Sequence, residues 1–320
     1  MKDKIKVNSR LLTAVMALIG LVFPLLTVVL RVWVLPSLRD LNTGMYSANY
    51  ILIVLLLLML VGLAVLGHLA DGKRRELGGY PARVTAVFTA VGGVVLAVTE
   101  VLNVEDSLST LRMASNTQQP MFIPVLAVLQ NVFGLLGGAA LVWMGLRLLL
   151  EGASRRGIAQ WSALAPVVWM WLRLVNYEVS YASMVRLKDS FFGLGMLILE
   201  LLFLFKLARY AAGVGKLPAG RMVACCMATA VFALSAPATR WILYLQDNSE
   251  AYAAYQLAGP VDFAIGVIAL AVGLTLVLAT LKAQPEESEE LETSVEEAAA
   301  PGMVESGGLV TSTPDEEPEA

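Results

Sequence analysis

The sequence predicts an all-α fold, a polytopic membrane helix bundle with eight transmembrane helices. Two observations lead to this fold class. Hydrophobic residues make up 58% of the chain and charged residues 15%, whereas a soluble domain has about 45–50% apolar and about 25% charged residues. The apolar residues also form separate blocks of about twenty, which is the helix length that crosses a hydrocarbon layer about 30 Å thick.

The expected helices lie between two segments of opposite charge. Residues 1–10 form a basic N-terminus, and the apolar block after it is too long for a signal peptide and has no small-residue cleavage site, so it is expected to remain as the first helix. Residues 283–320 hold twelve acidic side chains, no basic ones and no aromatic residue, which predicts a disordered acidic tail. Residues 11–282 form the transmembrane domain, with expected spans at 11–32, 49–68, 83–104, 122–148, 158–181, 190–210, 221–245 and 259–281.

The distribution of Lys and Arg predicts that both termini face the cytoplasm. Cytoplasmic connections of membrane proteins carry an excess of these residues. With the N-terminus inside, sixteen of the 23 Lys and Arg residues fall on the cytoplasmic side and six on the outer side, while Arg173 lies within a span. We therefore expect a multi-pass protein of the cell membrane, surrounded by the lipid bilayer. The longest outer connection, residues 105–121, is polar and is expected to be a cap or a solvated loop.

Similar features occur in both halves of the expected bundle. Basic turns with Gly and Pro precede the third and seventh spans, at 78–83 and 215–221, and Thr89 and Thr229 follow them 140 positions apart. One interpretation is a weak parallel repeat of four plus four spans. The other is that membrane helices resemble one another because they use few residue types.

Small residues at helical spacing predict places where helices pack closely. Gly134, Gly138 and Gly145 share one face of the fourth span. This face allows close packing either within the bundle or between copies in a homo-oligomer. Cys225 and Cys226 are adjacent inside the seventh span, which excludes a disulfide framework and favours packing as small apolar side chains.

The fifth expected span carries the most polar face of the membrane part. Arg173, Asn176, Tyr177 and Ser180 lie on one face at helical spacing, and Glu200 lies in the middle of the sixth span. Ionisable residues inside a span usually face a helix interface or a wet cavity. One interpretation is that these five residues line a binding site or pathway for a small polar or anionic solute. The other is that Arg173 pairs with Glu200 and holds the two helices together.

Three further ionisable residues lie near the outer ends of expected spans. Glu100 belongs to the third span, Arg240 to the seventh and Asp262 to the eighth. Arg240 and Asp262 have the same expected depth, so we expect them to form an interhelical charge pair, with Glu100 at the same level. A structural clamp is the favoured role of this group, because charges near the membrane surface also extend toward water.

The signatures of common enzyme classes are missing from the sequence. It has no H-E-x-x-H, G-x-S-x-G or G-x-G-x-x-G motif, and one histidine and two cysteines provide no metal-ligand pattern. We expect no cofactor, no metal and no nucleic-acid partner. Three functions stay open: a small-solute transporter or channel-like protein; a non-catalytic scaffold, sensor or assembly factor with structural charge pairs; and an intramembrane enzyme acting on a lipid-linked substrate, which has the least support.

Overall fold

The computed structural model describes residues 9–34, 46–70, 80–117, 121–151, 162–181, 187–212, 218–246 and 258–282. Every regular element in these residues is helical, which confirms the all-α class. The described α-helices are α1 (Ser9–Val29), α3 (Tyr46–Leu69), α4 (Tyr80–Thr117), α5 (Phe122–Glu151), α6 (Ala165–Tyr181), α7 (Leu187–Ala211), α8 (Ala219–Leu245) and α10 (Pro260–Lys282). A π-helix (Leu30–Val34) extends α1, and a 3-10 turn (Ser162–Leu164) precedes α6.

Six of the described helices are long and apolar enough to cross a membrane, namely α1, α3, α4, α5, α8 and α10. The chain is therefore consistent with a multi-pass membrane protein. Of the other two, α6 has 17 residues, and α7 carries Glu200, Lys206 and Arg209 within its apolar stretch. Each described α-helix overlaps one of the eight expected blocks. Membrane crossing by α6 and α7, and the side on which the termini lie, stay predictions.

Helix α4 differs from the expectation at its C-terminal end. The third span was expected to end at residue 104, whereas α4 has 38 residues and continues to Thr117. The added turns bury Ala114, and the side-chain amide of Asn131 on α5 donates to the Ser107 hydroxyl at 2.8 Å. Polarity ends a hydrophobic span but does not end a helix. At 1.5 Å per residue α4 is about 57 Å long, so part of it extends beyond a hydrocarbon layer of about 30 Å.

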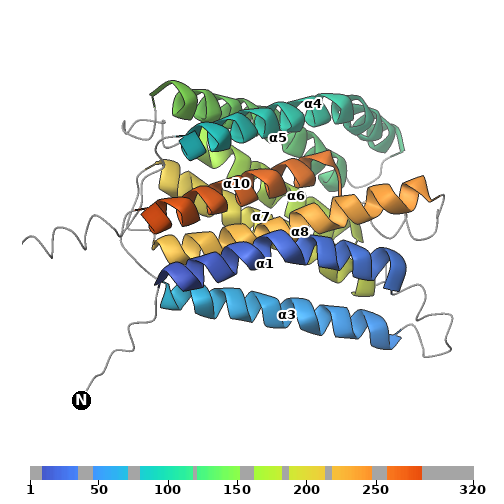
Figure 1. Cartoon of the computed structure of the whole chain (residues 1–320). Coiled ribbons are helices and arrows are strands. Elements are labelled where there is room, and N and C mark those ends of the chain that lie inside the picture. The colour runs from blue at the N-terminus through green and yellow to red at the C-terminus, as the bar shows by residue number, and fades with distance from the viewer. Residues whose placement is uncertain are drawn as a thin grey trace, which may run out of the picture. The chain divides into compact units, whose positions relative to one another are not determined.

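Helix α8 lies at the centre of the bundle, and most of its side chains are buried. Its sequence is rich in Ala, Cys and other small residues, which let neighbouring helices approach closely. Helices α1, α3 and α7 pack directly against it, and α10 reaches it through Gly266 and Gly273. In Figure 1, α3 lies at one edge beside α1, and α4 and α5 lie together at the opposite edge.

Helices α4 and α5 approach most closely where both carry small residues. A Cβ atom on Gly138 would lie 2.7 Å from the carbonyl oxygen of Gly93, and one on Gly145 would lie 2.6 Å from the carbonyl oxygen of Ala86. Both contacts are too short for a real side chain, so glycine is required at these crossings. The glycine face of α5 therefore packs against α4 of the same chain.

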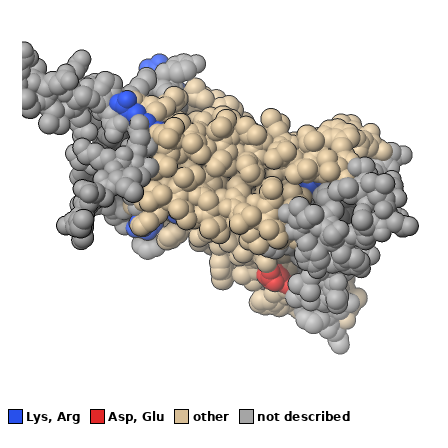
Figure 2. Space-filling model, turned by 60° about the horizontal axis from the view of Figure 1, so that its bottom comes forward, with Lys and Arg blue, Asp and Glu red and all other residues tan. Residues whose placement is uncertain are grey.

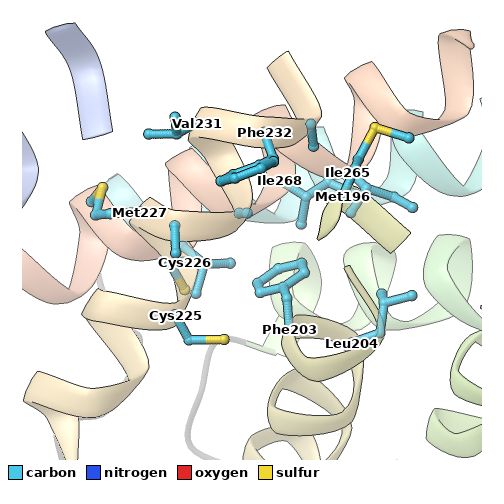
Figure 3. Packing of buried hydrophobic residues seen from close by; sticks show 14 of the residues in the cluster. Met196, Phe203, Leu204, Cys225, Cys226, Met227, Val231, Phe232, Ile265 and Ile268 are labelled. Atoms are coloured by element: carbon cyan, nitrogen blue, oxygen red, sulfur yellow. The ribbon is translucent and has the colours of Figure 1, made fainter. Parts of the chain in front are cut away.

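The interior between α7, α8 and α10 is a continuous apolar core. Figure 3 shows Phe203 and Met196 of α7 facing Cys226 and Phe232 of α8, with Ile268 of α10 beside them. All five side chains are buried. Cys225 and Cys226 are free thiols within this packing, in agreement with the expected role of small apolar side chains.

The two ends of the bundle differ in charge. Helix α1 begins and α3 ends at one end, which we call the basic end (Figure 1). Most of the described Lys and Arg side chains belong to helix termini at this end: Arg10, Arg83, Arg147, Lys206, Arg209 and Arg221. The middle of the face shown in Figure 2 is formed by uncharged residues, as expected of a surface in contact with lipid.

Candidate functional site

A buried ion pair between α6 and α10 lies toward the end of the bundle opposite the basic end. Both terminal nitrogens of Arg173 contact the carboxylate of Asp262: Nη1 contacts Oδ1, and Nη2 donates to Oδ2 at 3.0 Å. This two-point geometry is the strongest form of an arginine–carboxylate contact. Asp262 is fully buried, whereas the side chain of Arg173 is 15% exposed. The pair therefore lies almost entirely within the protein.

The start of α10 holds Asp262 in place. Gly259 is the N-cap residue of this helix, because its carbonyl oxygen accepts the first helical bond, from Phe263, at 3.2 Å. Pro260 follows as the first helical residue, a position that suits its fixed φ angle. Asp262 then reaches back and accepts the backbone N–H of Gly259 at 2.6 Å, as acidic residues at the third helical position commonly do. The positive end of the helix dipole also stabilises a carboxylate there.

Glu200 of α7 is the second carboxylate beside Arg173. Its Oε2 lies 3.9 Å from Nη1 of Arg173, the same nitrogen that contacts Asp262, and its side chain is fully buried. Neither carboxyl oxygen of Glu200 has a hydrogen-bond donor within the described part of the chain. Burial without a donor is costly for a carboxylate. Glu200 is thus held near a cation that is already engaged by another carboxylate.

Glu100 of α4 is the third buried carboxylate near this arginine. The indole nitrogen of Trp169 donates to its Oε1 at 2.8 Å, while its Oε2 has no partner among the described residues. The guanidinium of Arg173 lies 5.6 Å from the centre of the Trp169 ring. Gly134 of α5 makes room for this contact, since a Cβ atom there would lie 2.4 Å from Cγ of Glu100 and 2.9 Å from Cδ1 of Trp169.

The polar face of α6 continues beyond Arg173 toward its C-terminal end. The side-chain amide of Asn176 donates to Oε1 of Gln130 on α5 at 3.0 Å. Tyr177 is buried in the apolar core. Ser180 belongs to α6, but its side chain lies outside the described side chains. The structure thus brings Arg173, Glu200, Asp262 and Glu100 together, with Asn176 one turn away.

Arg240 of α8 has a different partner from the one that the sequence suggested. Its Nη1 donates to the carbonyl oxygen of Ala258 at 2.6 Å, just before the start of α10. Asp262, its expected partner, is held by Arg173 instead. Arg240 therefore contacts the backbone that leads into α10, and no ion pair joins it to Asp262 in the described residues. Depth in the membrane can be estimated from the sequence, but the direction in which a side chain points across the bundle cannot.

Sequence reasoning missed three residues that shape this site. Trp169 shares the polar face of α6, but nothing in the sequence marks it as the donor to Glu100, and Gly134 was interpreted only as a packing residue. Gln130 was not considered, although an amide next to Asn131 inside an apolar stretch is a usable signal for a polar contact. The short distance between Gly134 and Glu100 depends on how α4 and α5 are aligned, which the sequence does not specify.

The charges of the site do not balance. One guanidinium lies near three buried carboxyl groups, and two of these carry oxygens without a donor in the described structure. Such an arrangement can bind a proton or a small cationic group, because either one offsets the excess negative charge. Among the described residues, no three His, Cys, Asp or Glu side chains form a group that could hold a metal ion.

Comparisons with known proteins do not assign an activity to this site. No protein-family model matches the chain, and no curated protein or solved structure matches it. The class of protein is therefore defined by the fold alone. It is an all-helical bundle with several helices that are apolar enough to span a membrane. Any more specific function has to be argued from the charge cluster.

Proposed function

We propose that this protein is a membrane transporter with eight spans and cytoplasmic termini, and that it moves a small solute bearing a positively charged group. The binding site is the cluster of Arg173, Asp262, Glu200 and Glu100. The observation that carries the proposal is the surplus of buried carboxyl groups around a single guanidinium. Polar groups inside a membrane span are costly and are usually kept for function.

The charge balance favours a positively charged solute. Arg173 alone suggested an anionic one, but both of its terminal nitrogens are engaged by Asp262. The acceptors without a donor are the carboxyl oxygens of Glu200 and Oε2 of Glu100. An ammonium group placed beside either of them would gain charge-assisted hydrogen bonds. An ion pair that only joins two helices needs one carboxylate, so the other two carboxyl groups are not required for that role.

Access to these carboxyl groups requires a movement of Arg173. Its side chain is partly exposed and lies against Asp262 and Glu200, which are fully buried. Rotation of the guanidinium away from the cluster would open the carboxyl groups to a solute, and its return would close them. The bond between Asn176 and Gln130 provides further polar groups one turn away on α6.

An uptake assay with a mixture of candidate solutes tests the proposal. Proteoliposomes that contain the full chain, with an inside-negative membrane potential, are given a mixture of small amines, basic amino acids and size-matched carboxylic acids. Mass spectrometry of the vesicle contents is expected to show accumulation of a positively charged solute. Glu200→Gln should abolish it. Glu105→Gln, which changes an exposed carboxylate on the extension of α4, is the matched control and should retain it.

Accumulation of anionic solutes alone, or unchanged accumulation by Glu200→Gln, would contradict the proposal. Absence of any accumulation by the native protein would favour the second candidate, a non-catalytic scaffold whose charges serve packing. That candidate has its own support, because the Arg173–Asp262 pair joins α6 to α10 and the Trp169–Glu100 bond joins α6 to α4. A scaffold predicts that each loss of function follows a loss of stability.

A further inference from the structure

An open-sided cavity of about 370 Å³ lies between α3, α7 and α8 toward the basic end, and no residue of the charge cluster belongs to its lining. Its volume is within the range of small-molecule sites. His68 of α3, Lys206 of α7 and Arg221 of α8 line it. Each of these residues lies close to the end of its helix at the basic end. Three helices thus each contribute one nitrogen-bearing side chain to the same side of one cavity.

The remainder of the cavity is apolar. Leu60 of α3 and Leu202 of α7 belong to its walls, and Ala224, Cys225 and Ala228 of α8 belong to its lining as well. The small side chains on α8 explain why space is left between α3 and α7. The cavity is therefore amphipathic along its length, with basic groups toward the basic end and a hydrocarbon surface farther in.

Hydrogen bonds hold the basic groups together. Nζ of Lys206 donates to the carbonyl oxygen of Arg221 at 3.2 Å, and Nη2 of Arg221 lies 3.2 Å from Nδ1 of His68. Arginine cannot accept a hydrogen bond. Nδ1 of His68 is therefore the acceptor in this contact. These contacts keep two cationic groups and the imidazole side by side at the cavity.

We infer that this cavity binds an anionic phospholipid, with an acyl chain along the apolar walls and the phosphate on Lys206 and Arg221. Basic pockets between membrane helices on the cytoplasmic side are the usual sites for anionic head groups. The proposed orientation places the basic end in that leaflet. Charge complementarity and the apolar interior together select a lipid rather than a soluble anion, which would leave the apolar walls unused.

Native mass spectrometry of the full chain in detergent tests the inference. Equimolar dioleoylphosphatidylglycerol and dioleoylphosphatidylcholine are added, and the bound lipids are counted. The native protein should prefer phosphatidylglycerol. The double variant Lys206→Gln/Arg221→Gln should lower this preference about thirtyfold, as expected for the loss of two basic contacts near a lipid phosphate. Arg147→Gln/Arg209→Gln removes the same charge from the basic end outside the cavity and should keep it.

Two further measurements separate the cavity from the surface charge. Ala228→Leu fills the apolar part and should remove the tightly bound lipid; Ala64→Leu, on the α3 side, is the second variant if the first does not fold. Glycerol 3-phosphate in excess should not displace the lipid. Equal loss in both double variants, full lipid retention with a filled cavity, or displacement by glycerol 3-phosphate would each overturn the inference.

Discussion

Arg173 on α6 and Asp262 on α10 hold each other through two contacts, and Glu200 on α7 lies 3.9 Å from the same guanidinium. Three helices therefore meet at one arginine. The pair is buried on the carboxylate side and partly exposed on the arginine side. The pair thus links the two helices, and the proposed function requires that Arg173 move away to open the carboxyl groups.

Removal of either partner of this pair should be strongly destabilising. Arg173→Gln leaves the buried carboxylate of Asp262 without its cation, which costs about 3–5 kcal/mol. Asp262→Asn removes the two-point contact of Arg173, whose nearest remaining carboxyl oxygen lies 3.9 Å away on Glu200. Because the two residues interact directly, the double variant should lose less than the sum of the single losses, by about 0.5–3 kcal/mol. Free energies of unfolding in mixed detergent measure this coupling. Strictly additive losses would show that the two side chains act independently.

The Trp169–Glu100 bond should contribute measurably to stability. Trp169→Phe keeps an aromatic ring but removes the indole donor, so it leaves a buried carboxyl group with no donor at Oε1. We expect a loss of about 1.5–3 kcal/mol, as for hydrogen bonds to charged groups. Trp171→Phe is the control, since Trp171 lies two residues farther along α6 and is 53% exposed. Equal effects of both variants in the same unfolding assay would rule out a contribution from the bond.

Gly134 should tolerate no side chain. In Gly134→Ala the new methyl group would overlap Glu100 and Trp169, so we expect a loss of about 1–3 kcal/mol together with reduced uptake. Gly62→Ala on α3 is the matched control, because nothing lies within 4 Å of its Cβ position. Alanine is a better helix former than glycine by about 1 kcal/mol, so this control should be neutral or stabilising. A stable, active Gly134→Ala protein would mean that α4 and α5 are farther apart than described.

The number of spans can be tested between α6 and α7. If both helices cross the membrane, a reporter inserted after residue 184 lies on the outer side, and a reporter after residue 282 lies in the cytoplasm. If neither helix crosses, residue 184 lies on the cytoplasmic side, while the position of residue 282 is unchanged. A paired alkaline phosphatase and fluorescent protein assay distinguishes the two cases. An active fluorescent protein at residue 184 would reduce the bundle to six spans.

The sequence predicted the positions of the helices better than the contacts between them. Apolar blocks specify α1, α3, α5, α8 and α10 because crossing a membrane requires their length and composition. The continuation of α4 was missed, because hydropathy indicates which residues lie in the membrane and does not indicate where a helix ends. Arg173 and Asp262 were both recognised as costly residues in a membrane, but their pairing depends on helix rotation and on the N-terminal geometry of α10. Neither is encoded in local spacing.

The most direct test of the central claim is the midpoint temperature of thermal unfolding of Glu200→Gln. If Glu200 is kept for binding a positively charged solute, its buried carboxyl group adds little to stability, and the amide should leave the midpoint unchanged or raise it while uptake is lost. Glu105→Gln, measured in the same detergent, sets the baseline for an exposed carboxylate. A midpoint lowered as much as in Asp262→Asn would contradict the account and make Glu200 a structural partner of Arg173.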